Sequence, residues 1–194
     1  MPLPFTNGEY RRRVDAARAR MAEQGLDAIL LFHQESMFYL FGYDQLGYWV
    51  YQTAVLRADS PDIVALSRVA DHDLIAGLPG VSEVRVWKDD ALLNPAQVTV
   101  DLLRELGLLA SGKRVGIELR SHALLPYYYQ SILDNLPAGT RLEDASDLVT
   151  ELRLRKSDAE AAYVREAGKV VDAAYRAAFE AFRPGVLETE ILGA

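Results

Sequence analysis

Segments of helical periodicity alternate with short apolar runs along most of the chain, and this alternation restricts the possible folds more than any other feature. Apolar residues between 7 and 24 recur at helical spacing, and the nearly all-apolar run 26–32 follows them. Similar runs at 81–87 and 114–119 also follow helical segments. Short runs of this kind are typical of strands buried inside a sheet. The sequence therefore predicts an α/β fold.

One pair of strands is predicted to form a hairpin. Residues 50–57 and 63–66 have strand character, and the turn-forming sequence Asp59-Ser60-Pro61-Asp62 separates them. A hairpin pairs its strands antiparallel, whereas strands joined through helices can pair parallel. We therefore expect a mixed sheet covered by helices on both faces. The other expected elements are a helical turn at 36–40, helices at 69–78, 95–106, 122–136 and 147–155, and a short strand that begins at Arg141.

The composition excludes several classes of protein. The chain of 194 residues has a formal net charge of −7, so it has no general attraction for phosphate backbones, and we expect no nucleic-acid partner. Cysteine is absent, which excludes disulfides and thiolate zinc sites and fits a reducing, cytoplasmic location. No apolar run approaches the ~20 residues that a membrane-spanning helix needs, so no membrane partner is expected. The cluster Arg11-Arg12-Arg13 points in three directions on a helix and is interpreted as a solvated helix end.

The sequence pattern changes in its last quarter, where a long helical segment replaces the alternation of helices and short apolar runs. Ser157 and Glu160 form a capping box that starts a long helix, and Pro184-Gly185 ends it. The helix carries an apolar stripe that needs something to pack against. We therefore divide the chain into one domain at 1–155 and the start of an incomplete second domain at 156–194. The stripe consists of Val164, Ala167, Val171, Ala174, Ala178 and Phe182.

Motifs for known catalytic chemistries are absent from the sequence. The three histidines, His33, His72 and His122, do not stand in a paired metal-binding spacing. Asp71 and Asp73 flank His72, but adjacent residues on a helix diverge and do not easily share one ion. No serine lies in a nucleophile elbow, and no glycine-rich phosphate loop is present. We therefore predict no catalytic residue, no metal ligand and no cofactor in this chain.

One stretch has a composition suited to binding. Residues 38–51 contain seven aromatic side chains, and Gly42 and Gly47 give the segment the freedom of a loop. Aromatic side chains with polar tips often build binding surfaces or subunit contacts. Alternatively, residues 48–51 alternate along a strand and fill the two faces of the sheet. The residues predicted to contact a substrate or a subunit are Tyr43, Asp44, Tyr48, Trp49 and Gln52.

Three segments resemble the creatinase/aminopeptidase P/prolidase family, whose members are known as "pita-bread" metallohydrolases. The first is Gly25-Leu26-Asp27-Ala28-Ile29-Leu30-Leu31 with the later Met37-Phe38-Tyr39-Leu40-Phe41-Gly42-Tyr43. Ser36-Met37 stands where the family often has an Asn-x pair. The second is Glu151-Leu152-Arg153-Leu154-Arg155-Lys156-Ser157-Asp158-Ala159-Glu160, similar to the family's junction between two domains. The third is Pro184-Gly185-Val186-Leu187-Glu188-Thr189-Glu190.

The resemblance implies that residues 1–155 form a ribonuclease H-like amino-terminal domain and that 156–194 begin the catalytic domain. It also implies that the complete protein hydrolyses C–N bonds in a small molecule or a Xaa-Pro dipeptide. Creatinase-like, ectoine-hydrolase-like and peptidase activities all remain open. The family usually binds two divalent metal ions in the catalytic domain, although creatinase needs none. A homodimer is expected, in which this domain shapes the active site but is inactive alone.

A second hypothesis is a stand-alone small-molecule-binding or dimerisation module without hydrolase activity. The coding sequence beyond Ala194 separates the two hypotheses. A continuing frame with two Asp, one His and two Glu would support the hydrolase, whereas a stop codon would support the module.

Overall fold

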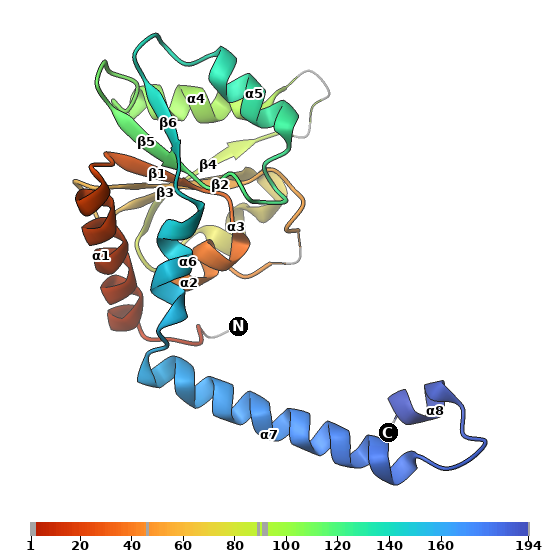
Figure 1. The fold of residues 1–194 in the computed structure, drawn as a ribbon. Coiled ribbons are helices and arrows are strands. Elements are labelled where there is room, and N and C mark those ends of the chain that lie inside the picture. Colours follow the sequence, from red (N-terminus) through yellow and green to blue (C-terminus); the bar gives the residue numbers. More distant parts are fainter. Residues whose placement is uncertain (1–2, 46, 89, 91–92, 194) are drawn as a thin grey trace. The chain divides into compact units, whose positions relative to one another are not determined.

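The computed structural model describes residues 3–45, 47–88, 90 and 93–193, which fall into two compact units, Met1–Leu154 and Arg155–Ala194. Each unit is described by itself. The first contains a sheet and the helices around it (Figure 1). Its elements are α1 (Asn7–Gln24), β1 (Ala28–Leu31), α2 (Gln34–Phe41), β2 (Thr53–Arg57), β3 (Ile63–Arg68), the 3-10 helix η1 (Val69–Asp71), α3 (His72–Ile75), β4 (Val81–Trp87), α4 (Pro95–Glu105), β5 (Arg114–Ile117), α5 (Pro126–Asp134), β6 (Arg141–Asp144) and α6 (Ser146–Leu154).

The six strands form one mixed sheet in the order β4-β3-β2-β1-β5-β6. The pairs β1/β2 and β2/β3 are antiparallel, whereas β3/β4, β1/β5 and β5/β6 are parallel. Leu30 in β1 lies between Val55 of β2 and Ile117 of β5. The predicted hairpin and the predicted mixed sheet are both confirmed.

Helices cover both faces of the sheet, as predicted. In Figure 1, α4 and α5 lie on one face, and α1, α2 and α6 lie on the other. Side chains alternate across a strand; accordingly, Ile29 and Leu31 pack in the core beneath α1, whereas Ala28 and Leu30 pack in the core beneath α4. All four residues of β1 are fully buried, so β1 is the centre of the domain.

The signals that end helices at glycine are confirmed, while several predicted boundaries are wrong. Gly25 ends α1 in the left-handed conformation, with a φ of 68°. The helix predicted at 69–78 is only a 3-10 turn and one α-helical turn, because Gly77 adopts a φ of 84°. The helix predicted at 122–136 begins only at Pro126, since a residue before proline favours an extended backbone. The strand predicted from Val50 starts at Thr53.

The interpretation of all three arginines on α1 as solvated is wrong for Arg13. Its side chain is fully buried, and its guanidinium donates to the Tyr39 carbonyl at 3.0 Å. The guanidinium carbon lies 4.1 Å from the ring centre of Phe5 and 4.5 Å from that of Tyr39. A charge can be buried here because aromatic faces and a carbonyl replace its water.

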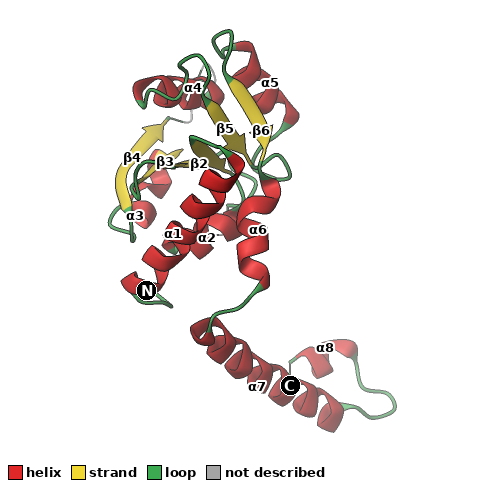
Figure 2. Ribbon diagram, turned by 60° about the vertical axis from the view of Figure 1, so that its left-hand side comes forward, coloured by secondary structure: helices red, strands yellow, loops and turns green. Residues whose placement is uncertain are grey.

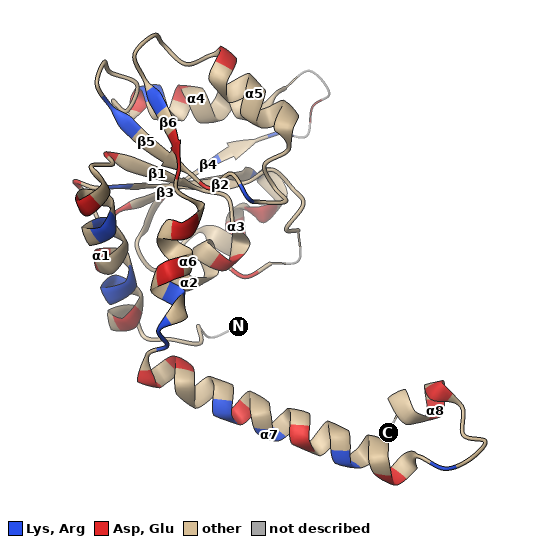
Figure 3. Ribbon diagram, viewed as in Figure 1, with Lys and Arg blue, Asp and Glu red and all other residues tan. Residues whose placement is uncertain are grey.

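The second unit consists of α7 (Asp158–Ala181) and α8 (Glu188–Leu192), shown as helices in Figure 2. Ser157 and Glu160 form the predicted capping box in both directions. No residue of α7 is buried, and the predicted stripe includes Val164 and Phe182, whose exposures are 62% and 70%. Basic and acidic residues are interspersed along α7 (Figure 3). Assignment of residues 156–194 to a catalytic domain stays a prediction.

Candidate functional site

The segment predicted to contact a substrate or a subunit connects α2 to β2. Tyr43 and Gln52 lie at its two ends and are buried, and the Tyr43 hydroxyl donates to Gln52 Oε1 at 2.8 Å. Burial raises the pKa of the Tyr43 hydroxyl, so it stays protonated as a donor. These two side chains therefore close the base of the loop by binding each other, and a ligand contact by either of them stays a prediction.

The middle of the same segment faces outward. Asp44 is exposed, and Tyr48 and Trp49 are 53% and 62% exposed. Their rings meet edge to face with centres 4.9 Å apart. Exposed aromatic side chains that lie against each other often mark a contact site.

Strand β2 begins only at Thr53, so residues 48–50 do not alternate across the sheet as the alternative had it. Of Tyr48, Trp49 and Tyr51, only Tyr51 packs in the core, and it too precedes the strand. Tyr51 is buried, its hydroxyl lies 2.6 Å from Thr99 Oγ1, and its carbonyl accepts from Trp87 Nε1. Tyr48 and Trp49 are held outside the core by the turn before the strand.

A second segment, distant in sequence, meets the first. The ring of His122, which is exposed, lies 5.8 Å from the ring of Tyr48, centre to centre. His122 belongs to the connection between β5 and α5. We call Tyr48, Trp49 and His122 the aromatic face. The sequence predicted Tyr48 and Trp49 but gave no reason to join His122 to them.

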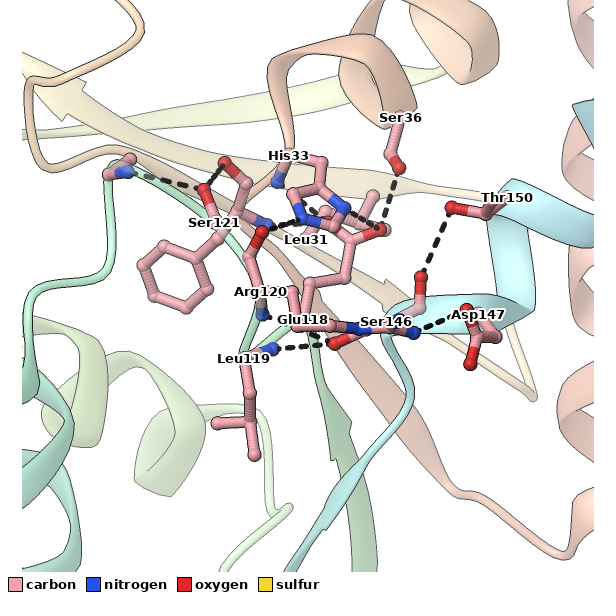
Figure 4. A network of polar contacts seen from close by, with 12 residues as sticks. Leu31, His33, Ser36, Glu118, Leu119, Arg120, Ser121, Ser146, Asp147 and Thr150 are labelled. Carbon is pink, nitrogen blue, oxygen red and sulfur yellow. Dashed lines mark hydrogen bonds and ion pairs between the residues drawn. The ribbon is translucent and has the colours of Figure 1, made fainter.

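Among the residues that follow β5 is also a buried carboxylate, Glu118, that the sequence did not single out. Glu118 follows β5, and because β1 and β5 run parallel, it lies beside the residues that follow β1. Its Oε2 accepts from the backbone N–H groups of Phe32 at 2.8 Å and His33 at 2.7 Å. Its Oε1 accepts from the Ser36 hydroxyl at 2.6 Å. Glu118, directly after β5, thus binds the turn at which α2 starts (Figure 4).

Two opposing effects act on the pKa of Glu118, and burial is the larger of them, so the pKa is raised. Burial raises the pKa of its carboxyl group, whereas the hydrogen bonds from Ser36 and from the turn at His33 favour the ionised form. The side chain of His33 lies alongside, with Nδ1 3.7 Å from Glu118 Oε1 and Nε2 2.6 Å from the Arg120 carbonyl. Because a carbonyl only accepts, Nε2 carries a hydrogen. His33 therefore bridges the two chain segments that follow β1 and β5.

Further hydrogen bonds fix the same connections. The Ser146 hydroxyl, at the start of α6, accepts from the N–H groups of Leu119 at 2.9 Å and Arg120 at 3.3 Å. Ser121 Oγ donates to the Phe32 carbonyl at 2.8 Å. Figure 4 shows these contacts converging on the ends of two neighbouring strands. The end of β5 is therefore held from two sides, by the turn before α2 and by α6.

The described residues offer no ready metal site. Among residues 3–45, 47–88, 90 and 93–193, no group of three or more His, Asp or Glu side chains could hold a metal ion. His72 lies 2.8 Å from Asp73, while Asp71 binds Arg68 instead. The divalent metals that the family resemblance implies do not fit these side chains. The described part of the chain also contains no helix long and apolar enough to cross a membrane.

Comparison with known proteins decides the family. The model of the creatinase/prolidase N-terminal domain matches residues 13–155. The chain belongs to this family. Its match covers the sheet, the aromatic face and Glu118, so the predicted family and the predicted type of amino-terminal domain are confirmed.

Individual relatives and solved structures agree with the assignment of the chain to the creatinase/prolidase N-terminal domain family. The ectoine hydrolase of Halomonas elongata is 29% identical over 98% of this chain and 48% of its own length. The creatinase of a Bacillus species is 29% identical over 96% of this chain and 44% of its own. A prolidase from Thermococcus sibiricus shares the fold, with a TM-score of 0.77 and 20% identity over 95% of this chain and 47% of that one. The chain thus spans about half the length of these relatives.

Proposed function

We propose that this chain is the non-catalytic amino-terminal domain of a hydrolase of C–N bonds, and that its aromatic face contributes to the active site of the complete protein. The observation that carries the proposal is the exposure of Tyr48 and Trp49 on a member of this domain family. The relatives called ectoine hydrolase and creatinase favour a small-molecule substrate, and the relative called Xaa-Pro dipeptidase keeps a dipeptide open.

The described side chains can bind and orient a substrate. Two ring faces at nearly 90° to each other, those of Tyr48 and Trp49, form a corner that excludes water from one side of a small molecule. The exposed carboxylate of Asp44 can pair with a cationic or amide group. The hydrolytic step itself belongs to residues outside this chain. Two divalent metal ions, if the protein is not creatinase-like, would activate water there.

We further propose a cytoplasmic homodimer in which this domain of one subunit faces the catalytic domain of the other. A corner of exposed aromatic rings suits that role, because aromatic residues are enriched at subunit interfaces. The exposed apolar stripe of α7 also supports the proposal that the chain is part of a larger protein, since such a stripe requires another surface to cover it. A stand-alone module would leave the stripe exposed.

Substitution in the complete protein tests the proposal. Tyr48→Ala and Trp49→Ala are compared with wild type for kcat/KM and melting temperature, with Leu74→Ala on α3 as control because Leu74 is similarly exposed, at 54%. We expect lower kcat/KM at an unchanged melting temperature for the first two variants only. Full activity in Tyr48→Ala and Trp49→Ala would refute a role at the active site.

A further inference from the structure

The hydrogen bonds around Glu118 have a consequence for the aromatic face. The two segments that carry Tyr48, Trp49 and His122 are separated by about seventy positions in the sequence, and they touch at the rings of Tyr48 and His122. Both segments are tied to the point where α2 begins, at its N-cap His33 and its first residue Gln34. Gln34 Nε2 donates to the Gln45 carbonyl in the first segment, and His33 contacts the Arg120 carbonyl in the second.

One buried side chain makes three of the hydrogen bonds that fix the start of α2. Glu118 is fully buried and holds three donors there, two backbone N–H groups and the hydroxyl of Ser36. Phe32 and His33 directly precede α2, so the carboxylate binds the turn from which the helix starts. The side chain of His33 itself does not cap α2. Glu118 therefore binds the same turn from which both ties start.

We propose that Glu118 is a positioning residue, which sets the aromatic face by holding the start of α2 in register with the end of β5. This inference rests on the proposed function, since it concerns the same face. The claim is distinct from mere stability, because a core residue elsewhere stabilises the fold without hydrogen bonds to either segment. Val14 on α1 is such a residue; it is buried in the core and contributes no hydrogen-bonding side chain.

Histidine resonances measure the position of the face directly. The chain has three histidines, so the Cε1–H signals of His33, His72 and His122 can be assigned from three His→Gln variants. The ring of Tyr48 lies edge to face with that of His122, at 73°, and shifts its signal, and Tyr48→Ala shows the position of that signal without the ring. His72, on α3, serves as the internal control.

Glu118→Met replaces both carboxylate oxygens by a weakly accepting thioether at nearly constant volume, whereas Glu118→Gln keeps an amide oxygen that can accept from Phe32 and His33. We expect the His122 signal of Glu118→Met to move towards its position in Tyr48→Ala, Glu118→Gln to restore it, and Val14→Ala to leave it unchanged. The His72 signal should stay in place throughout.

A folded Glu118→Met variant whose His122 signal stays at the wild-type position would overturn the proposal, as would an equal shift in Val14→Ala. If Glu118→Met does not fold, Ser36→Ala, which removes one of the three bonds, decides by the same two criteria. These spectra need no substrate. An active Tyr48→Ala enzyme would therefore refute the proposed function while leaving the positioning result in place.

Discussion

Replacement of Arg13 by alanine should destabilise the first unit strongly. The guanidinium is fully buried and donates to the Tyr39 carbonyl at 3.0 Å and to Glu9 at 3.2 Å. A hydrogen bond from a charged group contributes about 1.5–3 kcal/mol, and each desolvated cation–π contact adds about 0.5–2 kcal/mol. The cost of burying the guanidinium offsets part of this sum. We expect a net loss of about 3–5 kcal/mol in the free energy of unfolding, which is typical when one partner of a buried charged contact is removed.

Thermal unfolding followed by circular dichroism provides the assay. A loss of that size lowers the melting temperature of a domain of this length by roughly 6–20 °C. Arg11→Ala is the matched control, because Arg11 lies two residues before Arg13 on the same helix, is exposed, and should change stability by less than about 0.5 kcal/mol. A change below about 1 kcal/mol in Arg13→Ala would refute the reasoning, since the burial cost of the charge would then cancel its contacts.

Two further predictions concern other parts of the chain. Burial raises the pKa of the Tyr51 hydroxyl, so the unfolded chain releases this proton first and stability should fall as pH rises above about 10. Melting temperatures measured across that range should fall less steeply in Tyr51→Phe than in Tyr127→Phe, whose ring is 67% exposed; equal slopes would contradict the assignment. Ser157→Ala removes the capping box of α7 and should cost this helix about 1 kcal/mol. Hydrogen exchange should become faster in the α7 amides and stay unchanged in β1, and faster exchange in both would show that the two units are coupled.

The sequence predicted those parts of the fold that depend on local signals. Apolar periodicity marked the strands, the sequence at 59–62 marked the hairpin, and Gly25 and Ser157 marked helix ends that the structure confirms. These signals act over a few residues, so they can be recognised without knowing what packs against them. Where a boundary depended on one unusual backbone conformation, as at Gly77, the predicted helix was too long.

Features that depend on distant partners could not be predicted in this way. Arg13 is buried because Phe5 and Tyr39 cover it, and Tyr39 lies on another helix. The carboxylate of Glu118 can be buried because hydrogen-bond donors surround it. These donors lie 82 to 86 positions earlier in the chain, so no local pattern reveals them. The only local signal was an ionisable residue at the end of an apolar run, and that signal also fits a solvated strand end. Tertiary neighbours decided both cases.

Within the aromatic segment, composition identified candidate residues but not their directions. Tyr43 and Gln52 have polar groups that suit a ligand as well as they suit each other, and the structure pairs them. Tyr48 and Trp49 could have lined a strand, but the turn before Thr53 keeps them exposed. Side-chain direction followed from where the strand began, and the strand begins three residues later than predicted.

Hydrolysis by the isolated chain and by the complete protein tests the central claim most directly. Both would be assayed with Xaa-Pro dipeptides, creatine and ectoine, each with and without added Mn²⁺, Co²⁺ or Zn²⁺. The account predicts that the complete protein hydrolyses a C–N bond in at least one substrate, and that the 194-residue chain releases no product under any condition. Metal-dependent release of an amino acid from a Xaa-Pro dipeptide by the pure chain would contradict it.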